Sequence, residues 1–205
     1  MKTKDRILQI SLTLFNERGL SQVTLRTIAK EMGISQGNLN YHFKKRQDII
    51  KALYLCLVDR MDNIFRDLFE MEIGLPLIFA SNAAMIKAFL DFKFFMLDFV
   101  QIMRENKEIH QHYLQLQQIR KQQFESIVSL LQQKELVRQE EFEGEFASLQ
   151  KRMSIVGDFW ISSSEILDAD HSKQVDQYKN ILSEFIYPYL TPKGKKIFLQ
   201  IKANQ

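Results

Sequence analysis

The stretch GISQGNLNYHF, residues 33–43, governs the interpretation of the whole chain. It holds three amide side chains, at Gln36, Asn38 and Asn40, and three basic residues follow at once at positions 44–46. Amides are mediocre helix formers and are seldom fully buried. They can, however, both donate to and accept from the edge of a base pair. The stretch therefore predicts a surface that contacts DNA bases.

The composition favours an all-α protein. The chain of 205 residues contains only 7 Gly and 3 Pro, too few turn residues for a β-rich fold of this length. The single Cys56 excludes an internal disulfide and any site with several cysteine ligands. No apolar run approaches the roughly 20 residues that cross a bilayer, and the start, MKTKDRILQI, lacks the apolar core of a secretory signal. We therefore expect a soluble, cytoplasmic protein without a membrane partner.

The net charge of +3 is unevenly distributed along the chain. Residues 1–50 carry nine Lys or Arg against four Asp or Glu, whereas residues 51–205 carry 19 against 21. The positive excess thus coincides with the amide-rich stretch. A basic end of this kind is typical of a nucleic-acid-binding segment.

Three helices are predicted before residue 46. The first has one apolar face and stops at Gly19. Thr24 offers an N-cap for a second helix, LRTIAKEM, which ends at Gly33, and Ser35 offers an N-cap for a third, QGNLNYHF. The shared apolar seam consists of Ile28, Ala29, Met32, Ile34, Leu39 and Phe43. This pattern predicts a helix-turn-helix, whose second helix enters the major groove of DNA. The alternative is a plain three-helix bundle.

Residues 47–205 predict a larger helical bundle. The expected helices cover about 47–70, a long stretch from Asn106, 144–163 and 172–190. Between the first two, residues 76–103 are apolar nearly all round, and eight of the 16 Phe lie between residues 65 and 99. A short basic tail, KGKKIFLQIK, ends the chain.

One set of residues carries a resemblance by its order and spacing. Its members are Ile7, Leu8, Leu14, Phe15, Gly19, Thr24, Leu25, Ile28, Ala29, Gly33, Ile34, Ser35, Gly37, Leu39, Tyr41, His42, Phe43 and residues 46–49. Through them, residues 4–51 resemble the DNA-binding domain of TetR-family transcriptional regulators. Asn40 departs from the family pattern, which often has a second aromatic there, and Lys45 stands where a small residue is common. The resemblance implies an all-α, homodimeric regulator with a DNA-binding domain, residues 1–46, and a ligand-binding and dimerisation domain, residues 47–205.

The third helix is expected to contact the bases. Asn and Gln can bond adenine N6 and N7 together, and no Arg or Lys occurs between Gln36 and Phe43 to bond guanine. We therefore predict an operator that leans toward A·T, with Arg26 as the nearby candidate for a guanine. The expected DNA-binding residues are Thr24, Arg26, Ser35, Gln36, Gly37, Asn38, Asn40, Tyr41, His42, Lys44, Lys45 and Arg46.

Several members of this set suit phosphates, which fix register without specifying sequence. They are Thr24, Tyr41, His42, Lys44, Lys45 and Arg46. Thr24 also lies at a helix N-terminus, where free N–H groups favour an anion. For Tyr41 and His42 the alternative is packing on the third helix.

A single such helix touches few bases, so helix-turn-helix proteins usually dimerise on a palindromic operator. The resemblance implies that the last two long helices pair with their copies. The candidate contacts are Phe159, Trp160, Ile166, Leu182, Phe185, Ile186 and Tyr189. The alternative is that these residues fill the core of the monomer.

The resemblance also implies a repressor that a small hydrophobic ligand releases from double-stranded DNA. The candidate ligand-binding residues are Phe89, Phe92, Met96, Phe99, Met103, Tyr113, Phe124 and Trp160, with Phe79, Met85 and Phe95 as further candidates. For each of them an ordinary core position is the alternative.

Catalysis has little support in the sequence. His110 and His112 are two residues apart, so on a helix they point in different directions and cannot share a metal. We expect no enzyme activity, no cofactor and no metal. Two other functions stay open: a constitutive DNA-binding regulator that no metabolite reverses, and an all-α carrier of lipid or another hydrophobic ligand.

Overall fold

The computed structural model describes residues 2–167 and 171–204, the side chains of residues 171–175 excepted. Within these residues every regular element is a helix, and the β pairing consists of one antiparallel bridge between Val137 and Leu190. The prediction of an all-α fold is confirmed. None of the described helices combines the length and apolar character needed to cross a bilayer.

The chain packs as two compact units. Unit 1 comprises residues 1–61 and 88–111, and unit 2 comprises residues 62–87 and 112–205. The whole of the predicted DNA-binding domain falls within unit 1. The boundary proposed at residue 46 concerns function rather than packing, so it stays a prediction.

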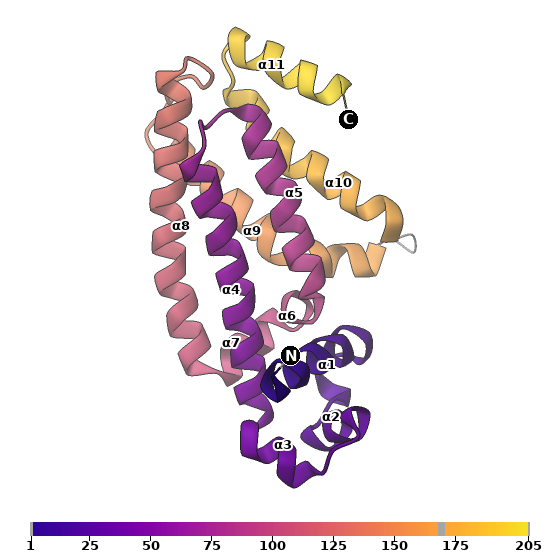
Figure 1. Cartoon of the computed structure of the whole chain (residues 1–205). Coiled ribbons are helices and arrows are strands. Elements are labelled where there is room, and N and C mark those ends of the chain that lie inside the picture. The colour runs from indigo at the N-terminus through magenta and orange to yellow at the C-terminus, as the bar shows by residue number, and fades with distance from the viewer. Residues whose placement is uncertain (1, 168–170, 205) are drawn as a thin grey trace. The chain divides into compact units, whose positions relative to one another are not determined.

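Unit 1 begins with three short helices and a 3₁₀ turn, drawn in indigo in Figure 1. Its elements are α1 (Thr3–Arg18), η1 (Leu20–Gln22), α2 (Leu25–Met32), α3 (Gln36–His42), the first part of α4 (Arg46–Glu70), the end of α5 (Leu75–Asp91), α6 (Lys93–Leu97), α7 (Phe99–Glu105) and the start of α8 (Lys107–Gln133). The second predicted helix has the expected bounds. The third ends one residue earlier than expected, because Phe43 has an extended backbone.

Aromatic rings join α1 and α4 to α6. The rings of Phe15 and Phe94 lie 5.1 Å apart between centroids, and those of Tyr54 and Phe95 stack at 5.3 Å. Phe15 and Phe94 are almost fully buried. Aromatic pairs of this kind add to the stabilisation that burial of their apolar area provides. The core of unit 1 therefore attaches α1 and α4, the helices that flank α2 and α3 in the chain, to α6.

The apolar stretch before residue 103 is divided into three helices, a division that the sequence pattern did not predict. Breaks at Phe92 and Asp98 separate α5, α6 and α7. At the first break, the Asn16 amide donates to the Asp91 carbonyl at 2.9 Å and accepts from the Phe94 N–H at 2.9 Å. A side chain on α1 thus satisfies backbone groups that the broken helix leaves free.

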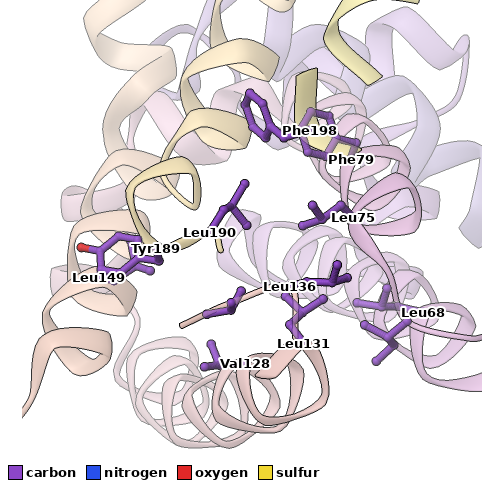
Figure 2. Close-up of a cluster of buried hydrophobic side chains, with 12 residues drawn as sticks. Leu68, Leu75, Phe79, Val128, Leu131, Leu136, Leu149, Tyr189, Leu190 and Phe198 are labelled. Carbon is purple, nitrogen blue, oxygen red and sulfur yellow. The ribbon is translucent and has the colours of Figure 1, made fainter. Parts of the chain in front are cut away.

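Unit 2 contains the remaining parts of α4, α5 and α8, together with α9 (Glu145–Leu167), α10 (His171–Glu184), η2 (Tyr187–Tyr189) and α11 (Pro192–Ala203). Its core is a cluster of buried apolar side chains that converge from α4, α5, α8, α9, η2 and α11 (Figure 2). Labelled members are Leu68, Leu75, Phe79, Val128, Leu131, Leu136, Leu149, Tyr189, Leu190 and Phe198.

The end of the chain differs from the sequence-based expectation. The helix expected over 172–190 ends at Glu184, and the basic tail forms α11. The Thr191 hydroxyl caps α11 by accepting from the Gly194 N–H at 3.1 Å, and Phe198 buries its ring in the core. A Cβ on Gly194 would lie 2.2 Å from the Leu136 carbonyl oxygen, so this close approach requires glycine.

An arginine fork fixes the start of α9. Arg138 donates to the two carboxylate oxygens of Glu145 at 2.7 and 2.8 Å, and the Glu141 N–H donates to the same carboxylate at 2.9 Å. These hydrogen bonds, the one from Arg138 foremost, lower the pKa of Glu145 to about 2. Glu145 is therefore a charged residue that helps to anchor the loop before α9.

Candidate nucleic-acid interface

The first helix of the predicted pair is held by a reciprocal cap. The Thr24 hydroxyl accepts from the Thr27 N–H at 3.2 Å, and the Thr27 hydroxyl accepts from the Thr24 N–H at 2.8 Å. Thr24 is exposed, and two of the N–H groups at this helix start are satisfied. The cap defines where α2 begins, as the sequence predicted.

The turn between α2 and α3 depends on Gly33. Its backbone is left-handed, with φ 67° and ψ 30°, a conformation that glycine adopts without a steric penalty. The Ile34 N–H donates to the Ala29 carbonyl at 3.1 Å, which closes the end of α2. The Ser35 hydroxyl then accepts from the Asn38 N–H at 3.1 Å and caps α3. Local interactions therefore set the start of α3, the predicted recognition helix.

α3 buries very little of its own surface. Leu39 is fully buried and Phe43, which follows the helix, is 4% exposed. The four remaining residues of its first turns are exposed: Gln36, Gly37, Asn38 and Asn40. Two apolar anchors thus hold a short helix whose amides face outward. This arrangement suits contacts with base edges in a groove.

The aromatic and basic residues after the amides differ in their surroundings. Tyr41 is 85% exposed, and its ring meets that of the half-buried His42 edge-on at 5.2 Å between centroids. Arg26, Lys44 and Lys45 are exposed. Such an exposed tyrosine beside several cations is suited to a phosphate backbone.

Arg46 has partners inside the protein. Its Nη1 donates to the Leu20 carbonyl at 2.6 Å and to the Val23 carbonyl at 3.2 Å. These bonds tie the start of α4 to the turn that precedes α2. The phosphate contact expected of Arg46 stays a prediction. The contacts with the two carbonyls could not be predicted from the sequence, because both partners are backbone groups distant in the chain.

The predicted ligand-binding residues divide between the two units. Phe89, Phe92, Met96, Phe99 and Met103 belong to unit 1, and Tyr113, Phe124 and Trp160 belong to unit 2. Within unit 2, an open groove of about 260 Å³ is lined by residues of α8, the following loop and α9, Phe124 among them. The ligand set stays a prediction.

Unit 2 also holds a partly buried acid. The Tyr113 hydroxyl donates to Asp158 Oδ2 at 2.7 Å, and burial raises the pKa of Asp158 to about 6. Trp160 lies two residues after Asp158 on α9, and its ring centroid is 4.4 Å from that of Tyr178. The indole N–H of Trp160 has no hydrogen-bond partner among the described residues. Among the described residues, no group of three or more His, Cys, Asp or Glu is arranged to hold a metal ion.

The candidate dimer contacts range from buried to exposed, and Leu182, Phe185 and Ile186 are intermediate. Trp160 and Tyr189 are buried in unit 2, at 3% and 6% exposed. Phe159 and Ile166 are 43% and 83% exposed. Ile155, four residues before Phe159, is 53% exposed and extends the apolar surface of α9. The sequence pattern could not separate the buried candidates from the exposed ones, because core and interface residues have the same chemistry.

Comparison with models of protein families shows which family the chain belongs to. The TetR model, described as "Bacterial transcriptional repressor", matches residues 58–198. The chain belongs to the TetR family. A second TetR-family model, "Bacterial regulatory proteins, tetR family", matches residues 7–53, the segment that holds α2 and α3.

TetR-family relatives of known role match mainly over a short segment. The biofilm operon icaADBC HTH-type negative transcriptional regulator IcaR of Staphylococcus aureus (strain Newman) is 38% identical over 61 residues, 30% of this chain and 33% of that protein. The HTH-type transcriptional repressor KstR2 of Mycolicibacterium smegmatis is 37% identical over 56 residues, 27% of each chain. The matched region therefore spans about a third or less of these relatives.

Two solved structures of transcriptional regulators share the fold over 91% or more of this chain. A TetR-family transcriptional regulator from Marinobacter aquaeolei VT8 superposes with a TM-score of 0.89 at 24% identity, covering 100% of this chain and 98% of that one. A transcriptional regulator from Saccharomonospora viridis, solved in complex with choline, has a TM-score of 0.71 at 20% identity over 91% of this chain and 96% of that one. At these identities the similarity establishes the fold.

Proposed function

We propose that this TetR-family protein is a sequence-specific transcriptional repressor that binds a palindromic operator as a homodimer. The observation that carries the proposal is α3, a capped helix anchored by Leu39 and Phe43 whose amides are exposed. A surface of exposed amides on a rigid helix has the donors and acceptors that base edges require. The relatives named as a negative regulator and as a repressor support repression.

The amides of Gln36, Asn38 and Asn40 would contact bases, and their preference for adenine leads us to expect an A·T-leaning half-site. Arg26 is exposed on α2 and would supply the contact with a guanine. The phosphate contacts would come from the exposed residues around the ends of α2 and α3. These are Thr24, Tyr41, Lys44 and Lys45.

A homodimer would present two recognition helices to successive major grooves, about 34 Å apart. The exposed apolar side chains of α9 support this assembly. Ile155, Phe159 and Ile166 recur at intervals of about one or two helical turns. An apolar face of this kind is more stable when a second copy covers it.

We further propose that a small hydrophobic effector binds the helical domain and shifts the dimer toward a conformation that no longer fits the operator. Binding of choline by a structural relative supports a small-molecule site in this fold. A regulator that acts on the chromosome would work in the cytoplasm. A constitutive repressor would show the same DNA binding, which no metabolite would reverse.

The test is a selection of binding sites from random duplex DNA, with the wild type and an Asn38→Ala plus Asn40→Ala variant in parallel. We expect an A·T-leaning palindrome for the wild type and its loss in the variant, while the thermal unfolding midpoints stay within about 2 °C, because exposed substitutions perturb stability little. A wild type that enriches no site at moderate salt would contradict the proposal. A G·C-rich contacted site would contradict the assignment of the amides alone.

A further inference from the structure

We propose that the start of α1, together with its N-cap Lys2, extends the DNA-binding surface, with Lys2 and Lys4 contacting the operator phosphates. The inference rests on the proposed DNA binding and adds a segment that lies before the TetR-family match at residues 7–53. It follows from where the structure places Lys4, which sequence spacing could not reveal.

The structure brings Lys4 to the end of the recognition helix. The Lys4 ammonium lies 5.5 Å from the centroid of the Phe43 ring. Phe43 is the residue that ends α3, and Lys44 follows it directly. A cation over an aromatic face is attracted by the ring, so the contact holds the ammonium in this position. Lys4, 39 positions before Phe43 in the chain, is therefore a neighbour of the predicted phosphate contacts.

The lysines at the end of α3 and at the start of α1 have no ion-pair partner among the described residues, although the Asp48 carboxylate accepts from the Lys45 N–H at 2.9 Å. Lys2, Lys4, Lys44 and Lys45 are exposed, and none forms an ion pair in the part of the chain that the structure describes. By contrast, Arg18 pairs with Glu31 at 3.5 Å. Unpaired cations beside one another repel in the free protein, and a partner with closely spaced negative charges relieves that repulsion.

A duplex fits this surface because it carries about one phosphate per 1.7 Å of helix axis. The surface is also continuous with the exposed amides of α3, so DNA held by the amides would bring its backbone to the adjoining lysines. Asp5 lies in the same turn as Lys4 and reduces the local charge by one. The segment from Lys2 to Arg6 still carries three basic residues against this one acid.

The test compares a Lys2→Ala plus Lys4→Ala variant with a matched Lys195→Ala plus Lys196→Ala control. The control also removes two lysines of α11, one of which lies over an aromatic ring, with the Lys195 ammonium 5.6 Å from the Tyr187 centroid. Affinity for the selected operator is measured by fluorescence anisotropy between about 50 and 200 mM salt, where the slope of log affinity against log salt counts phosphate contacts.

We expect the slope of the Lys2/Lys4 variant to fall by about 0.9 per contact, hence about 1.8 per protomer, with the sequence preference unchanged. The Lys195/Lys196 control should keep the wild-type slope. Lys4→Arg, which retains the cation, should retain its share of the slope. An unchanged slope in the Lys2/Lys4 variant overturns this inference but does not affect the proposal that the protein is a DNA-binding repressor. A wild type that binds neither a selected operator nor random duplex overturns both.

Discussion

Replacing Asp158 with Asn should stabilise the protein at alkaline pH. The carboxyl group is partly buried on α9, and its hydrogen bond is with the Tyr113 hydroxyl. Burial raises its pKa from an ordinary value of 3.8 to about 6. One pKa unit corresponds to about 1.4 kcal/mol, so the ionised carboxylate costs about 3 kcal/mol of folding free energy.

The sign of the pH dependence follows from that shift. The folded state binds the Asp158 proton more tightly than the unfolded state, so the cost is fully present above about pH 6 and disappears as the pH falls toward about 4. Asparagine cannot ionise, but its carbonyl can still accept from the tyrosine hydroxyl. We therefore expect Asp158→Asn to be more stable than the wild type at pH 8 and nearly equal to it close to pH 4.

The assay is thermal unfolding followed by far-UV circular dichroism at several pH values. For a protein of this size, 1 kcal/mol shifts Tm by about 2–4 °C, so the expected gain at pH 8 is about 6–12 °C. Tyr113→Phe is the companion variant, because it removes the donor that stabilises the charged form, and it should lower Tm more at pH 8 than near pH 4. An Asp158→Asn variant that is less stable than the wild type at pH 8, or equally shifted at every pH, would refute this reasoning.

Three further predictions concern backbone contacts and ion pairs. In a denaturant titration, Gly194→Ala should lower the free energy of unfolding by about 1–3 kcal/mol, because its Cβ would lie 2.2 Å from a backbone carbonyl oxygen. Gly157→Ala is the control: a Cβ there meets open space on α9, so the free energy of unfolding should rise by about 0.5–1 kcal/mol. Arg46→Ala should lower both the stability, by about 1.5–3 kcal/mol, and the affinity for the operator, whereas Lys45→Ala should lower the affinity alone. Equal unfolding midpoints for the two variants would contradict the structural role given to Arg46. Glu145→Gln should be less stable than the wild type at neutral pH. The difference in Tm should vanish as the pH falls from about 4.5 toward about 2, because the contacts that lower the pKa of Glu145 stabilise the folded protein only while its carboxylate is ionised.

The helix-turn-helix could be predicted because its determinants are local. Thr24, Gly33 and Ser35 cap and close helices within a few residues of their own positions. Leu39 and Phe43 supply the apolar anchors at helical spacing. A sequence pattern records interactions of this range directly, so the bounds of α2 were predicted correctly.

The middle of the chain had no comparable signal. From α5 to α7 the sequence is apolar on almost every side, so periodicity could not locate the breaks at Phe92 and Asp98. The first break is stabilised from α1 by Asn16, and the phosphate candidate Arg46 is engaged by carbonyls of an earlier turn. These contacts join segments far apart in the chain, so no local pattern could reveal them.

The contrast between the two candidate sites has a physical origin. A helix that contacts DNA bases must expose particular hydrogen-bonding groups, whereas an ordinary solvent-facing helix can carry any polar residue. A run of exposed amides such as that on α3 therefore differs in composition from a core and from a typical charged surface. A site for a hydrophobic ligand needs the same aromatic and methionine side chains that fill a core. The exposed fractions are only 6% for Phe92, 3% for Met96 and 3% for Trp160. Core residues would be buried to this extent with or without a ligand. Burial alone therefore cannot identify a sensing residue, whereas the exposed amide cluster on a capped and anchored helix supports the proposed contact with DNA.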